Sequence, residues 1–142
     1  MLQSSVRVTA TGVPEGYDAL ILSGQAKDRV LLHVCRDDAR MAVLSGAVRF
    51  FAPNLTVIEF PAWDCLPYDR VSPNPEIVAQ RLDSLGKLAG KIESGLVLTT
   101  VSAILQRVPD PDLFHRGGLT GKVSERISQD EFTEYFMRNG YR

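Results

Sequence analysis

The sequence predicts an α/β fold in which an open, mostly parallel sheet carries helices on both faces. Short apolar runs that suit strands alternate with longer segments of helical periodicity, in the order strand, helix, strand, helix, strand, between Val30 and Thr100. The connections between these strands are long enough for parallel crossovers. The composition agrees, because 44% hydrophobic and 23% charged residues in a chain of 142 are typical of a globular domain.

The N-terminal part predicts a strand, a loop and a helix. Residues 4–10 alternate polar and apolar side chains, which is typical of a strand with one buried face. The turn-rich residues 11–16 follow. Residues 17–27 are rich in apolar side chains and contain no helix breaker before Gly24, so we expect a helix there.

The next segment predicts a strand and a capped helix. Residues 30–35 form a nearly continuous apolar run, the pattern of a strand covered on both faces in a parallel sheet. Asp37 and Asp38 suit the N-cap of a helix that ends near Phe51, before Pro53. The apolar side chains that recur at spacings of three and four along this helix are Met41, Leu44, Val48 and Phe51.

The rest of the chain predicts two more strands and two more helices. Residues 55–60 and 95–100 suit strands, and residues 76–89 suit a helix between them. Pro109, Pro111 and Gly117-Gly118 mark an exit from the sheet domain. A helix then begins at Ser128 and reaches Asn139, with Gly140 as its cap.

These boundaries predict a domain division. We expect a sheet domain over residues 1–108, a linker over 109–127, and the first helix of a second small domain over 128–142. The chain stops at Tyr141-Arg142, directly after this helix, where a following strand would ordinarily begin. We therefore expect a fragment of a longer protein.

The charge balance excludes the usual nucleic-acid-binding class. Lys and Arg number 16 against 17 Asp and Glu, a formal net charge of -1, so a strong phosphate-binding surface is not expected. We expect Arg81, Arg107 and Arg116 to be solvated or ion-paired. No run approaches the ~18 apolar residues of a membrane span, and no signal-peptide pattern opens the chain. These features predict a cytoplasmic protein with no membrane contact.

The loop between the first strand and helix occupies the position of a phosphate-binding loop. Gly12 and Gly16 are one residue too close for that motif. Tyr17 stands where a Lys would pair with phosphate, and Asp18 stands where a Ser or Thr would ligate Mg²⁺. Glu15 and Asp18 would repel phosphate. We interpret the segment as a degenerate phosphate loop or a plain turn, and we expect no cofactor and no catalytic residue.

His33 and Cys35 lie two apart on a predicted strand, so both point to one face. Cys65 or His115 could join them as metal ligands, but the spacing matches no established metal motif. We interpret the pair as packed core or a satisfied histidine and expect no metal. The two cysteines should be reduced, packed thiols, because this chain is long enough to bury a core without disulfides.

The proline-rich loop after the second strand carries most of the site candidates: Trp63, Tyr68, Asp69 and Arg70. Open α/β sheets place ligand crevices at the carboxyl ends of their strands, where this loop begins. One interpretation is therefore a ligand crevice. The favoured one is structural, with the aromatic rings plugging the sheet edge and Arg70 paired with Asp64 or Asp69.

The same segments closely resemble the N-terminal region of bacterial transcription-repair coupling factors. That family has a Trp-x-x-Leu-Pro-Tyr-Asp-x-x-Ser-Pro loop, matched here within residues 59–73. It also has an Arg-Leu helix, matched at 81–82, and a strand leading into a Leu-x-Gln-Arg-Val turn, matched within 96–109. The resemblance covers about residues 12–142 and is strongest over 57–109.

The resemblance implies a degenerate RecA/helicase-like domain, related to the first domain of the B component of the excinuclease, followed by the start of a second domain. It implies that this module lacks the nucleotide site and the damage-probing hairpin. The parent protein would be an ATP- and Mg²⁺-dependent DNA translocase of nucleotide excision repair. It would displace stalled RNA polymerase and recruit the A component of the excinuclease through regions mostly outside this chain.

The resemblance therefore implies a non-enzymatic scaffold or interaction module, whose partners are the other domains of the same parent chain. No functional residue of the family is carried onto this sequence. The alternative is a small independent α/β protein that binds a ligand or nucleotide in a crevice from Trp63 to Arg70.

Overall fold

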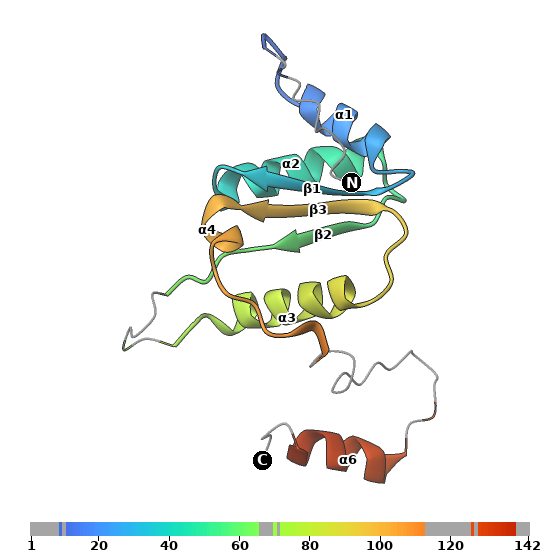
Figure 1. Cartoon of the computed structure of the whole chain (residues 1–142), viewed down its shortest axis with the longest axis vertical. Helices are drawn as coiled ribbons and strands as arrows, with labels where there is room; N and C mark the ends of the chain where they lie inside the picture. The colour runs from blue at the N-terminus through green and yellow to red at the C-terminus, as the bar shows by residue number, and fades with distance from the viewer. Residues whose placement is uncertain are drawn as a thin grey trace, which may run out of the picture.

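The computed structural model describes residues 9, 11–65, 70, 72–112, 126 and 128–138. In this part of the chain, three parallel strands form one sheet: β1 (Val30–Cys35), β2 (Val57–Phe60) and β3 (Gly95–Thr100). Their spatial order is β1-β3-β2, so the last strand in sequence is the central one (Figure 1). The predicted α/β class with an open parallel sheet is confirmed.

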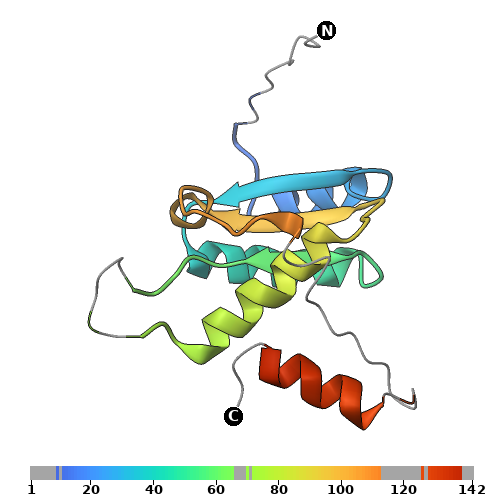
Figure 2. The same ribbon diagram turned by 60° about the horizontal axis from the view of Figure 1, so that its bottom comes forward.

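Helices pack around both faces of this sheet (Figures 1 and 2). The helices are α1 (Tyr17–Gln25), α2 (Asp38–Phe51), α3 (Pro75–Ala89), α4 (Val101–Ile104) and α6 (Gln129–Arg138). Helices α1 and α2 cover one face, α3 lies on the other, and α4 follows β3 directly. Helix α6 lies apart from the sheet in both views.

Local sequence signals explain where two of these helices begin. The Asp37 carboxylate caps α2 by accepting the Arg40 backbone N–H at 2.8 Å, and this hydrogen bond lowers the pKa of Asp37. The Asn74 side chain caps α3 by accepting the Glu76 N–H at 2.9 Å. Pro75 then occupies the first turn, where its missing N–H costs nothing.

The main core lies between the sheet and the pair α1 and α2. The buried cluster on this face consists of Ala19, Ala26, Cys35, Met41, Leu44, Val48, Leu96 and Leu98. The predicted stripe of α2 is therefore buried at its first three positions. Phe51 is half-exposed, because it is the last residue of α2, where the chain turns into the loop toward β2.

The expectation that β1 is covered on both faces is wrong. Leu31, His33 and Cys35 face the main core, whereas the residues between them face the α3 side, where Leu32 is 60% exposed. On that side α3 packs over β2 at the far edge of the sheet, and the short α4 contacts β1 and lies beside Leu32, so the β1 row is only partly covered. The strand buried on both faces is instead β3, in which every residue is buried.

Some predictions concern segments that the structure does not describe. Gly117-Gly118, the Gly140 cap and, apart from Thr9, the strand predicted over residues 4–10 lie outside the described residues. The helix predicted from Ser128 is present as α6. The division into domains at 108 and 127 stays a prediction.

We predict that Leu98→Ala lowers the free energy of unfolding by about 3 kcal/mol, because Leu98 is 0% exposed in the central strand and the change leaves a cavity. The control is Leu105→Ala. Leu105 is 81% exposed, so its truncation should change the free energy by less than about 0.5 kcal/mol. Urea denaturation measures both, and equal losses would contradict the central position of β3.

Candidate functional site

Backbone conformation and a backbone hydrogen bond form the turn in the loop before α1. Gly12 and Gly16 have φ values of 68° and 83°, a left-handed conformation that favours glycine. The Tyr17 N–H donates to the Pro14 carbonyl at 3.2 Å. The two glycines therefore have a structural reason to be present, independent of any ligand.

A protein carboxylate occupies the N-terminal turn of α1. Asp18 Oδ1 accepts the Ala19 N–H at 2.9 Å, and Oδ2 pairs with the Arg40 guanidinium of α2 at 2.5 Å. A negative charge is favourable at the positive end of a helix dipole, which is the position that an anionic ligand would otherwise occupy. Here the chain supplies both the anion and the neighbouring cation.

His33 and Cys35 lie beside this ion pair, at the carboxyl end of β1. Burial lowers the pKa of His33, although Asp18 opposes the shift, and burial raises the pKa of the Cys35 thiol. Both Cys35, which is buried, and Cys65, which is half-buried, are free thiols. Among the described residues, which do not include His115, no cluster of three or more His, Cys, Asp or Glu could hold a metal ion.

A second cluster lies at the carboxyl end of β2 and centres on Arg81 of α3. Its guanidinium carbon lies 4.2 Å from the Phe60 ring centroid and 4.4 Å from that of Trp63. Arg81 Nη1 donates to the Pro61 carbonyl at 2.5 Å and to Gln106 Oε1 at 3.1 Å. The same Gln106 oxygen accepts the Trp63 N–H at 3.0 Å. We call these five residues the Arg81 clasp.

The expectation that Arg81 is solvated or ion-paired is wrong. Arg81 is 1% exposed, its guanidinium donates to the neutral oxygens of Pro61 and Gln106, and burial lowers its pKa. Its Nε has no hydrogen-bond partner in the described part of the chain. A buried charge without a carboxylate is costly, and cation–π contact with two rings offsets part of that cost. The rings of Phe60 and Trp63 therefore stabilise the buried guanidinium of Arg81. Arg81 in turn holds Trp63 and Pro61 in place where the loop leaves β2.

One sequence signal could have revealed the burial of Arg81. Arg81 lies on the apolar stripe of α3, between Ile77 and Leu88 at helical spacing, and not among the charged residues of the opposite face. Ser84 lies on the same stripe, and its hydroxyl donates to the Glu59 carbonyl at 2.6 Å. Polar side chains on a sheet-facing stripe must find partners, and these two find them at the end of β2.

The structure brings some of the predicted loop residues into contact and not others. Trp63 is half-buried against Arg81, whereas Arg70 is exposed. Both oxygens of the Asp64 carboxylate lie 3.2 Å from the Asn74 N–H, so Asp64 closes the loop onto the start of α3 instead of pairing with Arg70. Tyr68 and Asp69 lie outside the described residues.

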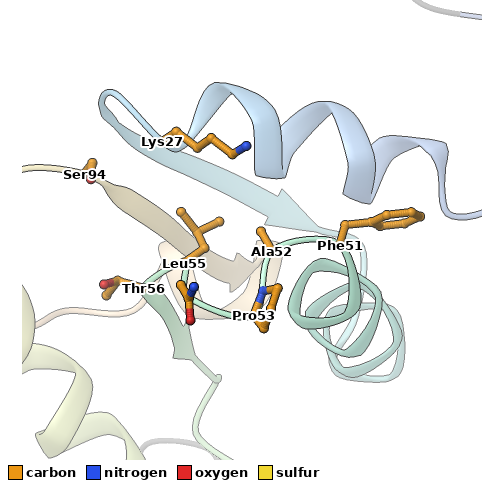
Figure 3. Close-up of a pocket in the computed structure, with 8 residues that line it drawn as sticks. Lys27, Phe51, Ala52, Pro53, Leu55, Thr56 and Ser94 are labelled. Carbon is orange, nitrogen blue, oxygen red and sulfur yellow. The ribbon is translucent and has the colours of Figure 1, made fainter.

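A hollow of about 390 Å³ lies at the opposite, amino end of the sheet (Figure 3). The end of α2, the loop that follows it, Lys27 and Ser94 form its walls. Lys27 carries the only charge among the described residues that line it. A single flexible ammonium gives little ligand selectivity, so this hollow is a weaker candidate than the two clusters above.

Comparison with known proteins identifies relatives. No family model matches the chain. The transcription-repair-coupling factor of Haemophilus influenzae is 32% identical over 128 residues, 89% of this chain. Those of Escherichia coli and Rickettsia bellii are 31% identical over 86 residues and 30% identical over 92 residues, 61% and 65% of this chain. The chain is a distant homologue of transcription-repair-coupling factor.

The chain spans only about a tenth of these proteins: 11% of the Haemophilus influenzae factor, 7% of the Escherichia coli factor and 8% of the Rickettsia bellii factor. The resemblance inferred from the motifs around Trp63 is thereby confirmed. The activity that gives transcription-repair-coupling factor its name belongs to proteins roughly eight times longer than this chain. No helix in the described ranges is long and apolar enough to cross a membrane.

We predict that Arg81→Lys lowers the free energy of unfolding by about 3 kcal/mol, because an ammonium cannot lie flat between two rings while it serves Pro61 and Gln106. The control is Arg107→Lys. Arg107 is exposed, so this variant should change the free energy of unfolding by less than about 0.5 kcal/mol. Urea denaturation provides the measurement.

A double-mutant cycle checks the partner assignment. Trp63→Leu and Arg81→Met should show a coupling energy of about 1 kcal/mol, the scale of a partly desolvated cation–π pair. Coupling near zero would mean that the indole packs independently of the guanidinium.

We predict that the stability of the chain falls as the pH drops below about 6.5, and that His33→Gln removes part of this fall. Burial holds the pKa of His33 below its ordinary value of 6.5 in the folded state, so the unfolded state binds the proton more readily. The stabilising contribution is complete above 6.5 and is lost as the pH falls through the folded pKa. Parallel wild-type and variant stability curves between about pH 7 and pH 5 would exclude this role for His33.

Proposed function

We propose that the chain is a non-catalytic scaffold and interaction module of a longer transcription-repair-coupling factor. The parent protein would be a cytoplasmic, ATP- and Mg²⁺-dependent DNA translocase. It would displace stalled RNA polymerase and recruit the A component of the excinuclease for nucleotide excision repair. Identity of 32% over 89% of the chain supports the parent assignment, and the two clusters at the carboxyl end of the sheet support the role of this part.

The Asp18–Arg40 ion pair is the observation that carries the proposal. In a working phosphate loop, the helix N-terminus and a lysine neutralise phosphate, and a hydroxyl ligates Mg²⁺. Here the Asp18 carboxylate lies in the first turn of α1 and accepts the Ala19 N–H, and Arg40 is already paired with that carboxylate. Bringing in a nucleotide phosphate would place like charges together and would separate the ion pair.

The Arg81 clasp supports the scaffold role. It joins the end of β2, helix α3 and the turn after β3 through one guanidinium and one amide oxygen. The Trp63 ring is occupied by this internal contact, which leaves less of it for stacking on a ligand. For this reason we favour the scaffold over an independent ligand-binding protein that uses the Trp63–Arg70 loop.

We predict that the chain does not bind Mg-ATP. Tyr17 replaces the phosphate-binding lysine, and the Asp18 carboxylate occupies the helix N-terminus. Isothermal titration calorimetry should detect no binding with a dissociation constant below about 100 μM, the value that corresponds to a binding free energy of roughly -5.5 kcal/mol. A tighter value would overturn the proposal.

A matched variant separates charge repulsion from the missing lysine. Asp18→Ser removes the carboxylate and introduces a hydroxyl, but it leaves Tyr17 in place. We expect this variant also to fail to bind Mg-ATP, because both the lysine and the Mg²⁺ ligand are needed. If the Asp18→Ser variant bound Mg-ATP and the unchanged chain did not, the Asp18 carboxylate would be the one feature that prevents binding.

We predict that the chain binds duplex DNA more weakly than about 1 μM at physiological salt, without sequence preference, because a net charge of -1 offers little counterion release. Fluorescence anisotropy with labelled duplex DNA measures this. Sub-micromolar affinity would mean that the arginines form a concentrated basic patch, and would assign DNA contact to this part of the parent protein.

A further inference from the structure

Two adjoining hollows lie at the amino end of the sheet. The first is the hollow of about 390 Å³ beside Lys27 (Figure 3), and the second has a volume of about 410 Å³. Thr56, directly before β2, and Ser94, directly before β3, line both of them. A segment that crosses these two residues would therefore reach both hollows.

Backbone contacts fix the junction between the two hollows. The Leu96 N–H donates to the Thr56 carbonyl at 2.8 Å, and the Gly95 N–H donates to the Arg29 carbonyl at 3.2 Å. Gly95 has a φ of 150°, and a Cβ at this position would lie 2.8 Å from the Thr56 carbonyl oxygen. Glycine permits this close approach. The junction is thus formed before any partner arrives, which lowers the entropic cost of binding.

The first hollow combines an apolar lining with one cation. Phe51, Ala52, Pro53 and Leu55 line it, and the Leu55 N–H donates to the Ala52 carbonyl at 3.0 Å within the loop. In Figure 3 the side chain of Lys27 extends above Ala52 and Leu55. An apolar side chain that enters this hollow would lie beside an ammonium. A carboxylate next to that side chain would therefore gain a partner of opposite charge.

The second hollow adds further charge. Lys87, Lys91 and Glu93 line it, and Lys87 pairs with Asp83 at 2.5 Å. Lys27 and Lys91 form no ion pair within the described part of the chain. The described residues that line the two hollows carry three positive charges and one negative charge, although the whole chain has a net charge of -1. This local basic surface supplies the selectivity that the first hollow lacks by itself.

The apolar lining favours a protein over a nucleic acid as the partner. A phosphodiester backbone carries a charge at every step and no apolar side chain, so it would leave Pro53 and Leu55 in contact with water. An acidic peptide can place an apolar side chain in the first hollow and carboxylates near Lys27 and Lys91. The peptide therefore matches both the lining and the charge of this surface.

We propose that the amino end of the sheet is a docking site for an acidic segment of a separate partner protein. One large apolar side chain of this segment enters the hollow beside Phe51 and Leu55. The acidic residues that follow it cross Thr56 and Ser94 toward Lys91. The inference rests on the proposed function, because it takes the chain to be an interaction module and names the chemistry of its partner.

The test begins with random dodecapeptides displayed on phage. The library is depleted on a variant that carries both Lys27→Glu and Lys91→Glu, and is then selected on the unchanged 142-residue chain. The enriched peptides should carry a leucine, isoleucine or aromatic residue within about three positions of two or more acidic residues. No enrichment, or enrichment of peptides without acidic residues, would overturn the proposal.

The most enriched peptide is labelled with fluorescein and titrated by fluorescence anisotropy. Lys27→Glu and Lys91→Glu should each weaken binding by about tenfold. Both lysines are exposed, so these charge reversals should leave the fold intact. Phe51→Ser should weaken binding by a similar factor, because it removes one apolar wall of the hollow.

Matched controls separate local contacts from general effects. Arg107→Glu is an equal charge reversal at an exposed position after α4, and Phe50→Ser removes the aromatic ring next to Phe51 in the sequence. Neither residue lines either hollow. Each control should change the affinity by less than about twofold. Equal losses in a variant and in its control would overturn the proposal.

Two competitors identify other occupants. Unlabelled duplex DNA at about 1 μM should not displace the peptide, and displacement would assign this surface to nucleic acid. The longer parent protein should bind the peptide within about threefold of the affinity of the 142-residue chain. Loss of binding in the parent protein would mean that another part of its chain fills the hollow. Either of these contrary results would overturn the proposal.

Failure of this inference can be told apart from failure of the proposed function. The Mg-ATP titration concerns the opposite end of the sheet and does not involve these hollows. No Mg-ATP binding together with no selected peptide would reject the docking site and keep the non-catalytic assignment. Mg-ATP binding together with the expected peptide would do the reverse.

Discussion

The buried guanidinium of Arg81 is the contact on which the carboxyl end of this domain depends. It is held between Phe60 and Trp63 and donates to Pro61, so it fixes the direction in which the chain leaves β2. Through Gln106 it also fixes the turn after β3. A buried charge with neutral partners is stable only while its surroundings stay complete. The proline-rich loop, α3 and the central strand are thus joined at one point, which stabilises the loop without a ligand.

At the same end of the sheet, an internal ion pair lies at the N-terminal turn of α1, a position that favours anions. The loop before α1 keeps the two left-handed glycines and the helix N-terminus, which are the backbone parts of a phosphate-binding arrangement. Asp18 and Arg40 supply the opposite charges from within the chain. The two glycines are needed for the turn itself, whatever the loop binds. Tyr17 and Asp18 stand at the positions that a lysine and a hydroxyl have in a phosphate-binding loop.

The unequal faces of the sheet connect the fold to a role within a larger protein. One face is covered by α1 and α2, and the other by α3 and the short α4, with Leu32 60% exposed beside a buried Val97. An exposed apolar strip of this kind is unfavourable for an isolated domain and useful for one that other segments pack against. The distant homology to factors about eight times longer fits this arrangement.

The sequence by itself determined the fold class, the approximate positions of β1, β2 and β3 and the cap of α2 at Asp37, because these depend on periodicity and on neighbours a few residues apart. It also showed that Tyr17 and Asp18 differ from the lysine and hydroxyl of a phosphate-binding loop. Only the tertiary structure decided that β3 lies between β1 and β2, that one face of β1 is open, and that Arg81 is buried. These facts depend on contacts between segments far apart in the chain. Phe60, Trp63 and Gln106, for example, contact Arg81 because the tertiary structure brings their segments together. Local patterns carry no information about which edge of a sheet a strand joins, so they cannot show which apolar side chains remain uncovered.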